Sequence, residues 1–421
     1  MGSPRAVGRR ATVTTEHRLR RATLHLAIVG LALLATVAAA ALGSAAGARG
    51  LVATAVLIAT PRLERVAVGA LRLWVLRDDE SVLSPGVRGN KARKFAALPT
   101  DAPLASYGGA QSNAAAALAA LAAARSLPFT YYLNGAAPRH LREAPLGNYA
   151  ALLSRGAELV ELPRPDGGYA ALRAYAEDPA SAPRPHFLVA GVRLVPQGGA
   201  CAWAEAGFAP LGARLDCVAR ELRAATGART VALVGAGTGA SALFLARHTD
   251  VPVVALPCAM GAKALRTELL ALSARAPAAG GGGSARLPLV LEEPAGPPVR
   301  FGGLEPRALD AWRLSRASGL FVDLLYGAPA LAQLLAAGGE AVVRALLLDN
   351  GDDAEGPLEL VWVHTGGLEG VPSQLGRYAR LGLATATELE RAHEEAAALA
   401  QSDFIPTSSR AEAGESGTRG K

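Results

Sequence analysis

Two of the four lysines in this chain lie three residues apart, in the segment Val87–Phe95 (VRGNKARKF). The chain carries 39 arginines, so lysine is a rare choice of cation here. Lys91 and Lys94 follow a turn-forming Gly-Asn pair. An amine that has cations nearby and is partly shielded from water has a lowered pKa, which a lysine needs to form a Schiff base. The segment therefore indicates an amine nucleophile, a phosphate site, or simply the solvated basic start of a helix.

A second polar cluster, Ser106–Asn113 (SYGGAQSN), follows a short apolar strand and opens an alanine-rich helix. In open α/β sheets, ligands bind at the carboxyl ends of strands, where this cluster places hydroxyl, amide and backbone N–H groups. The alternative is that Ser112 or Asn113 only caps the helix.

A third cluster, Val234–Ser241 (VGAGTGAS), joins a predicted strand to a predicted helix. Its glycines allow successive N–H groups to point at one anion, with help from the helix N-terminus. The loop lacks the Gly-Lys-Ser/Thr ending of a Walker loop and the GxGxxG spacing of a dinucleotide site. A single phosphate or carboxylate fits better.

The fourth cluster, Val363–Gly367 (VHTGG), ends a predicted strand late in the chain. Thr365 can offer a hydroxyl group to a ring nitrogen, although an ordinary exit from strand to turn has the same pattern. Together the four clusters supply one amine, one phosphate cradle and two polar strand ends. A phosphorylated aldehyde cofactor held by a lysine needs such a set, which predicts pyridoxal 5′-phosphate.

Short apolar runs alternate with longer Ala/Leu-rich stretches from about residue 60, which predicts parallel α/β structure with crossover helices. The predicted strands are Leu71–Leu76, Phe129–Leu133, Glu158–Leu162, Phe187–Val189, Thr230–Val234, Val253–Leu256 and Leu358–Val363. The predicted helices are Ser112–Arg125, Gly147–Arg155, Leu211–Thr226, Ser241–His248, Ala262–Ala274, Pro306–Ala317 and Ala328–Ala337. The segments that are predicted as loops or a disordered tail are Ala276–Pro298, Asn350–Pro357 and residues 405–421.

The formal net charge of +7 lies almost wholly in residues 1–50, which carry seven arginines and one glutamate. Within them, residues 22–48 are nearly all apolar and exceed the roughly 20 residues that span a bilayer. This leader has three interpretations: a mitochondrial or plastid transit peptide, a secretory signal, or a single membrane anchor. The arginine-rich start, in which Glu16 is the one acidic residue, favours a transit peptide and hence an organelle.

The rest of the chain has a net charge of only +1 and no basic patch interleaved with aromatic residues, so we expect no nucleic-acid partner. The three cysteines, Cys201, Cys217 and Cys258, match no disulfide framework and no metal-ligand spacing. We expect them to be small buried residues and expect no metal site.

The order of these motifs resembles that of the 1-aminocyclopropane-1-carboxylate deaminase / D-cysteine desulfhydrase family, within the tryptophan-synthase-β-like (fold type II) pyridoxal-phosphate enzymes. The similarity runs from about Thr60 to Tyr378. Its anchors are Arg77–Asp79 (RDD), Gly89–Lys94 (GNKARK), Gly108–Asn113 (GGAQSN), Pro196–Ala200 (PQGGA), Gly235–Ser241 (GAGTGAS) and His364–Gly367 (HTGG).

The resemblance implies two parallel-sheet, three-layer α/β domains with the cofactor in the cleft between them. A catalytic region over residues 51–404 would contain the smaller domain, about residues 104–200, inserted in the larger. The resemblance also implies a homodimer.

The resemblance implies a function for each cluster. Lys91 would be the Schiff-base lysine, with Lys94 as a supporting cation. Asn113 would bond the phenolic oxygen of the cofactor, and Thr365 would face its pyridine nitrogen. The residues that would hold the phosphate are those of the third cluster, Gly235, Ala236, Gly237, Thr238 and Gly239, continuing to Ser241.

Ser112 and Tyr326 would be the catalytic residues beside the substrate. In the deaminases proper, a glutamate follows the tyrosine and the late motif is His-Leu-Gly-Gly, whereas Gly327 and Thr365 occupy those positions here. The family's Gly-Lys after the tyrosine is absent, and alanines follow Asn113 where relatives often have His and Arg. The threonine favours the D-cysteine desulfhydrase side, because a neutral ring nitrogen suits elimination of a good thiol leaving group.

The resulting hypothesis is a lyase acting on a small amino acid, which converts D-cysteine to pyruvate, sulfide and ammonia. One alternative is deamination of 1-aminocyclopropane-1-carboxylate to 2-oxobutanoate and ammonia. Others are a racemase or another lyase for a small amino acid, and a membrane-anchored relative that binds the cofactor without turnover.

Overall fold

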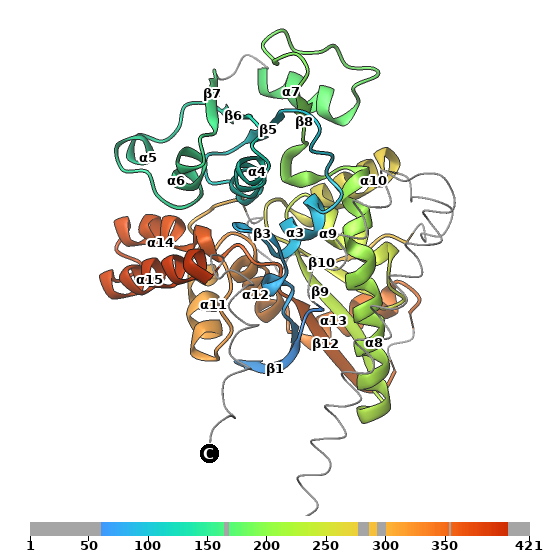
Figure 1. The fold of residues 1–421 in the computed structure, drawn as a ribbon. Helices are drawn as coiled ribbons and strands as arrows, with labels where there is room; N and C mark the ends of the chain where they lie inside the picture. The colour runs from blue at the N-terminus through green and yellow to red at the C-terminus, as the bar shows by residue number, and fades with distance from the viewer. Residues whose placement is uncertain (1–59, 164–167, 277–285, 293–299, 353–354, 403–421) are drawn as a thin grey trace, which may run out of the picture. The chain divides into compact units, whose positions relative to one another are not determined.

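The computed structural model describes residues 60–163, 168–276, 286–292, 300–352 and 355–402. Two sheets carry most of the strands of this part of the chain (Figure 1). The predicted leader and the predicted tail lie outside the described residues, as do parts of the two predicted loops.

The larger sheet has six strands in the order β1-β2-β12-β9-β10-β11. Strand β1 pairs antiparallel with β2, and all the other pairs are parallel. The strands are β1 Leu63–Val68, β2 Leu71–Leu76, β9 Arg229–Ala236, β10 Val253–Pro257, β11 Leu289–Val290 and β12 Leu358–Val363.

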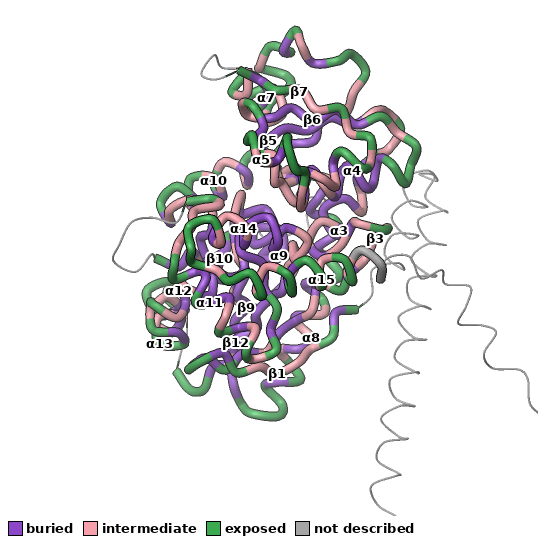
Figure 2. The backbone as a smooth tube through the Cα atoms, turned by 90° about the vertical axis from the view of Figure 1, so that its left-hand side faces the viewer, coloured by how far each residue is buried: buried purple, intermediate pink, exposed green. Residues whose placement is uncertain are grey.

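Alternate residues of these strands enter two separate hydrophobic cores, because successive side chains of a strand point to opposite faces. Leu233 and Leu256 pack with helices α11, α12 and α13, while Val234 and Ala255 pack with α8, α9 and α10. Figure 2 shows the central strands as mostly buried. Coverage on both faces explains why β9 and β10 are continuous apolar runs rather than alternating patterns. These helices are α8 Ala209–Thr226, α9 Ala240–Arg247, α10 Ala262–Arg275, α11 Pro306–Ala317, α12 Gly327–Ala336 and α13 Glu340–Asp349.

The second sheet has four parallel strands in the order β7-β6-β5-β8. Leu104 and Tyr131 face the core shared with α4 and α6, and Tyr107 and Tyr132 face the core that includes Leu172 of α7. The elements are β5 Leu104–Gly108, β6 Phe129–Asn134, β7 Glu158–Leu162, β8 Arg193–Leu194, α4 Asn113–Ala124, α6 Gly147–Ser154 and α7 Gly168–Glu177.

The remaining elements are short or lie late in the chain. They are β3 Val82–Ser84, β4 Val87–Arg88, α3 Gly89–Phe95, α5 Arg139–Glu143, α14 Val371–Arg380, α15 Ala386–Ser402 and the 3-10 helices η1 Asp78–Glu80, η2 Gln197–Gly199, η3 Ala202–Phe208 and η5 Leu368–Gly370.

Six of the seven predicted strands and all seven predicted helices occur within two residues of their predicted starts and ends. The strand predicted at Phe187–Val189 is wrong. That segment is a turn after Pro185, in which the Leu188 N–H donates to the Pro185 carbonyl at 3.0 Å. Strand β8 lies a few residues further on and has only two residues, too few to form a recognisable alternating pattern.

Among the described residues, no single helix is long and apolar enough to cross a bilayer. The pair α12 and α13 meets the criterion of length and composition together, but it is bent by 82°. The predicted anchor at residues 22–48 lies outside the described residues, and the inserted domain at about 104–200 stays a prediction.

Candidate active site

The site lies where the carboxyl ends of parallel strands meet. Strands β2, β12 and β9 are neighbours, so the segments that follow them lie along one edge of the six-stranded sheet. A cavity of about 170 Å³ is lined by residues from these segments together with residues of α3, α4 and α6. All the predicted site residues line it: Lys91, Ser112, Asn113, Gly235, Ala236, Gly237, Thr238, Gly239, Tyr326 and Thr365.

Lys91 lies in the first turn of α3, a helix that begins at Gly89 rather than after the lysines. Its Nζ donates to the Asn90 Oδ1 at 2.9 Å. Burial lowers the pKa of Lys91 to about 8, although the negative charges of Asp323 and Glu369 raise it. With a pKa of about 8, roughly a fifth of this amine is neutral near pH 7.4, far more than for an ordinary lysine, and this fraction can attack a carbonyl carbon.

Lys94, one helical turn further on, has a different environment. Its side chain is buried, and its Nζ donates to the Gly198 carbonyl at 2.9 Å. Burial and the charge of Lys91 lower the pKa of Lys94 well below its usual value. Lys94 also lines the cavity, and its bond to Gly198 ties α3 to the PQGGA segment.

In the loop between β9 and α9, Gly237 and Gly239 have no room for a side chain. Gly239 is the N-cap of α9 and has φ +78°, a conformation that favours glycine. A Cβ at Gly237 would lie 2.7 Å from the Tyr326 Cε1, and one at Gly239 would lie 2.6 Å from the Leu269 Cδ2. The N-terminus of α9 leaves backbone N–H groups without intrahelical partners. The loop therefore has the geometry of an anion cradle.

Thr365 lines the cavity from the end of β12, and its backbone is in contact with α3. Its carbonyl accepts from the Asn90 N–H at 3.2 Å. A Cβ at Gly89, where φ is +57°, would lie 2.3 Å from that carbonyl oxygen. The Asn90 Nδ2 also donates to the Ser241 Oγ at 3.1 Å. Asn90 thus joins three of the four predicted motifs.

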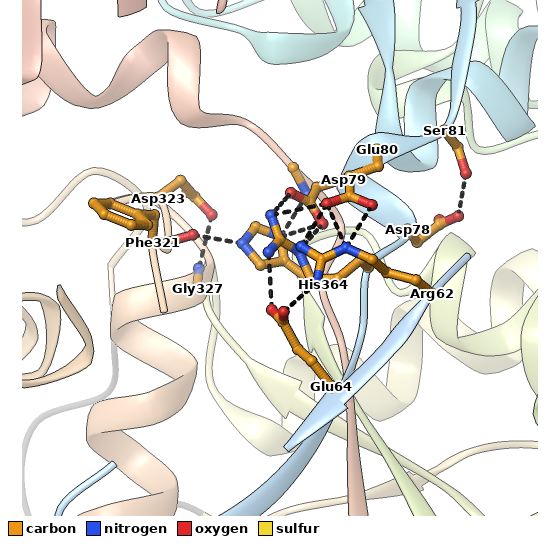
Figure 3. Close-up of polar contacts among 12 residues, drawn as sticks. Arg62, Glu64, Asp78, Asp79, Glu80, Ser81, Phe321, Asp323, Gly327 and His364 are labelled. Carbon is orange, nitrogen blue, oxygen red and sulfur yellow. Dashed lines mark hydrogen bonds and ion pairs between the residues drawn. The ribbon is translucent and has the colours of Figure 1, made fainter. Parts of the chain in front are cut away.

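A buried histidine holds the turn that contains Thr365. The Gly366 N–H donates to the His364 Nδ1 at 3.2 Å, so the His364 Nε2 carries the hydrogen and donates to the Phe321 carbonyl at 2.5 Å. Figure 3 shows this contact and the nearby ion-pair network of the RDD segment. In that network, Arg77 makes two hydrogen bonds to Asp79, at 2.8 and 2.7 Å.

The two aspartates of the RDD segment make different contacts. Burial raises the pKa of Asp79, but its hydrogen bonds with Arg77 and nearby positive charge outweigh this, so the net shift is downward. Asp78 is fully buried, and its Oδ1 accepts from the Arg93 Nε at 2.6 Å and from the Ser81 Oγ at 2.9 Å. Because Arg93 lies on α3, this ion pair fixes the helix that carries Lys91.

Asp323 positions Tyr326. Its carboxylate accepts from three backbone N–H groups, those of Leu325, Tyr326 and Gly327, at 2.7–2.9 Å. These bonds form the start of α12. Burial raises the pKa of the Tyr326 hydroxyl, which therefore stays protonated and can act as a hydrogen-bond donor.

Ser112 is the N-cap of α4, and its Oγ accepts from the Ala115 N–H at 3.3 Å. The Oδ1 of Asn113 accepts from the Nδ2 of Asn148, a buried residue of α6. Ser112 therefore caps α4, as the alternative interpretation of this cluster predicted. This capping does not prevent the hydroxyl from facing the cavity, which Ser112 also lines.

Three of these residues have no predicted function from the sequence: Asp323, Asn148 and His364. Asp323 had a usable signal, since an aspartate a few residues before a helix start is typical of a turn that bonds backbone N–H groups. His364 was noted only as part of a motif, and Asn148 had no local signal because its partners lie 35 and more residues away.

No family model matches this chain, and no curated protein matches it. Solved structures do. The crystal structure of an ACC deaminase homologue has a TM-score of 0.51 at 18% identity, covering 79% of this chain and 99% of that chain. A fungal L-serine ammonia-lyase from Rhizomucor miehei has a TM-score of 0.47 at 14% identity, covering 80% and 98%. Maize serine racemase has a TM-score of 0.44 at 11% identity, covering 79% and 97%.

The first match defines the class of fold, and the two lower scores support no conclusion about this chain. The chain is an α/β protein with the fold of fold type II (tryptophan-synthase-β-like) enzymes, and the predicted fold class is confirmed. This is the fold that the motif resemblance to the ACC deaminase / D-cysteine desulfhydrase family implies.

Proposed function

We propose that this protein is a pyridoxal-phosphate-dependent lyase that eliminates the β-substituent of a small amino acid, with D-cysteine as its substrate. The observation that carries the proposal is the placing of the Lys91 amine, with its pKa lowered to about 8, in one cavity with the loop between β9 and α9.

The residues present fit the cofactor. The N–H groups of Gly237, Thr238 and Gly239 directly precede α9, whose N-terminus is the positive end of the helix dipole and suits a phosphate. Lys91 has the basicity that a Schiff base requires. Asn113 and Thr365 line the same cavity with side chains that can bond a phenolic oxygen and a ring nitrogen.

When bound, pyridoxal phosphate withdraws electrons from the Cα of an attached amino acid, which acidifies the Cα hydrogen and allows a β-substituent to leave. Lys91 would hold the cofactor and then move the Cα proton at its Nζ, with the Asn90 Oδ1 orienting that nitrogen. The protonated hydroxyl of Tyr326 would donate a hydrogen bond to the substrate or its leaving group.

Thr365 supports elimination over ring opening. A threonine hydroxyl beside a pyridine nitrogen leaves that nitrogen neutral, so electron withdrawal is weaker than with an acidic partner. Loss of a thiol, which is a good leaving group, needs less electron withdrawal than opening a carbon ring. This argument favours D-cysteine over 1-aminocyclopropane-1-carboxylate.

The test is release of keto acid by the full-length purified protein, with D-cysteine, L-cysteine, D- and L-serine and 1-aminocyclopropane-1-carboxylate assayed in parallel. We expect pyruvate and sulfide from D-cysteine, and a visible absorption band that Lys91→Ala abolishes. Lys263→Ala is the matched control, because Lys263 is exposed on α10. Borohydride reduction should attach the cofactor to Lys91. A band that persists in Lys91→Ala would refute the assignment, and a band without turnover would indicate a binding protein.

A further inference from the structure

The side of the cavity that is built by α4 and α6 has small side chains. Ala114, Ala116 and Ala117 of α4 and Ala151 of α6 all line it. Alanine leaves free volume beside a bound ligand, so this side can take a substituent larger than the thiol of cysteine. The alanines do not by themselves say what that substituent is.

Arg155, the C-cap of α6, lies on this same side of the cavity and gives it a positive charge. The residue is half-buried, and its Nη1 donates to the Ala151 carbonyl of its own helix at 3.3 Å. Among the described residues Arg155 forms no ion pair. Its guanidinium therefore keeps most of its five N–H donors for another partner.

Gly86 makes room for this guanidinium. It has φ +76°, and a Cβ at this position would lie 2.5 Å from the Arg155 Nη2 and 3.0 Å from the Ala120 Cβ. The guanidinium thus lies level with Ala120 of α4. Ala120 is eight residues beyond Ser112, which corresponds to about 12 Å along a helix. Arg155 is therefore well separated from the polar end of α4.

The charged residues that line the described cavity are mostly basic. The acidic ones are Asp79, which is bonded by Arg77, and Glu369 of η5. The basic ones are Arg88, Lys91, Lys94 and Arg155. Burial lowers the pKa of both lysines, so Arg88 and Arg155 are the cations of fixed charge in this lining. A phosphate at the α9 N-terminus would occupy only one part of the cavity, which leaves the side with Arg155 for a second negative group.

We propose that Arg155 binds an anionic group at the far end of an elongated leaving group, so that besides D-cysteine the site takes a cysteine S-conjugate whose sulfur substituent ends in a carboxylate. This inference rests on the proposed elimination. The Cβ–S bond breaks and the electron pair leaves with sulfur, which takes a proton to give a free thiol. One water is consumed, and the products are the carboxylate-bearing thiol, pyruvate and ammonia. A guanidinium matches a carboxylate in shape and charge.

The activity test compares S-(2-carboxyethyl)cysteine with S-propylcysteine, a neutral compound of equal length, each in both D and L forms. We expect kcat/KM for pyruvate release to be about tenfold higher with the carboxylate compound, because one charge-assisted hydrogen bond contributes a factor of about this size. Arg155→Gln should remove this preference. Arg125→Gln, which removes the exposed arginine at the C-cap of α4, should keep the preference.

A binding test separates this inference from the proposed function. Thiodipropionate has two carboxylates and no amine, so it cannot react, and 3-(propylthio)propionate is its counterpart with one carboxylate. We expect thiodipropionate to bind the wild-type protein about tenfold more tightly, and Arg155→Gln to bind both equally while unfolding at the same temperature as Arg125→Gln. Equal binding by the wild-type protein, or an unchanged ratio in Arg155→Gln, would overturn the assignment of Arg155. If the wild-type protein shows this affinity ratio but does not turn over D-cysteine, the proposed elimination is wrong and the assignment of Arg155 stands.

Discussion

The two sides of the cavity differ in how much space they leave. On the side built by α3 and the loops of the six-stranded sheet, an added methyl group at Gly89, Gly237 or Gly239 would lie under 3 Å from another atom. On the side that belongs to the four-stranded sheet, α4 and α6 present alanines to the cavity and Gly109 has nothing within 4 Å of such a group, although an added methyl group at Gly108 or Gly147 would lie 2.6 or 2.8 Å from another atom. The tight side is where the lysine, the anion cradle and Thr365 meet, so it determines what the site does. The open side determines what fits beside it.

The largest effect that this contrast predicts is from Gly89→Ala. The substitution adds strain at φ +57° and forces a Cβ against the Thr365 carbonyl, which we expect to cost about 3 kcal/mol or more of unfolding free energy. Urea unfolding measures it. Gly156→Ala is the control, since Gly156 has φ +72° but nothing within 4 Å, and it should cost only about 1–2 kcal/mol. If the two variants lost equal unfolding free energy, the close approach of α3 to Thr365 would add nothing to the cost of Gly89→Ala.

A smaller effect is expected from Gly237→Ala, whose Cβ would displace the Tyr326 ring. We expect a loss of about 1–3 kcal/mol and weaker uptake of pyridoxal phosphate. Gly109→Ala, on the open side, should change stability by less than about 0.5 kcal/mol. If Gly109→Ala proved as costly as Gly237→Ala, the two sides would not differ as described.

The pH dependence of cofactor uptake tests Lys91, on the tight side of the cavity. Burial lowers the pKa of Lys91 to about 8, so below pH 8 the neutral amine fraction falls about tenfold per pH unit. Uptake of pyridoxal phosphate by the cofactor-free protein should slow in proportion, and it should level off above pH 8. Glu369→Gln removes a negative charge that raises this pKa, so the profile should shift to lower pH. A profile that rises steadily to pH 10 would show that Lys91 is an ordinary lysine.

A modest stability effect is expected at Ser112, the N-cap of α4. Ser112→Ala loses the cap on the Ala115 N–H and should cost about 1 kcal/mol. Ser112→Asn keeps a good N-cap residue and should leave stability nearly unchanged. If Ser112 also contacts substrate, both variants will lower kcat, whereas unchanged kcat in Ser112→Asn would assign the serine to capping alone.

The strands and helices that were correctly predicted have long apolar runs and strong local patterns. Strand β1 and helices α7, α13, α14 and α15 were not predicted. The strand predicted at Phe187–Val189 failed because three apolar residues shortly after a proline do not distinguish a strand from a turn, and in this turn only Leu188 is buried. The start of α3 at Gly89 was missed because Gly-Asn is typical of a turn, and only the contact with Thr365 selects the glycine.

The candidate site was predictable as a set of motifs, since each combines glycines with polar residues at a strand end. Its supporting residues were not predictable. Asn148 bonds across to Asn113, and His364 bonds to Phe321 over 43 residues of chain, so no local pattern reports either contact. The sequence likewise did not distinguish Arg155 from the other 38 arginines, because only the fold places it in the cavity with the alanines of α4.

The sequence by itself determined the α/β class, the order of the motifs, and which lysines were rare enough to suspect, because these depend on residue type and local spacing. Only the tertiary structure decided how the surroundings of Lys91 and Lys94 differ. The two amines lie one helical turn apart, yet one bonds to the neighbouring Asn90 and the other to Gly198, more than a hundred residues away. The depth of burial and the charges that face each amine set its pKa, and both arise from segments that meet only when the chain is folded.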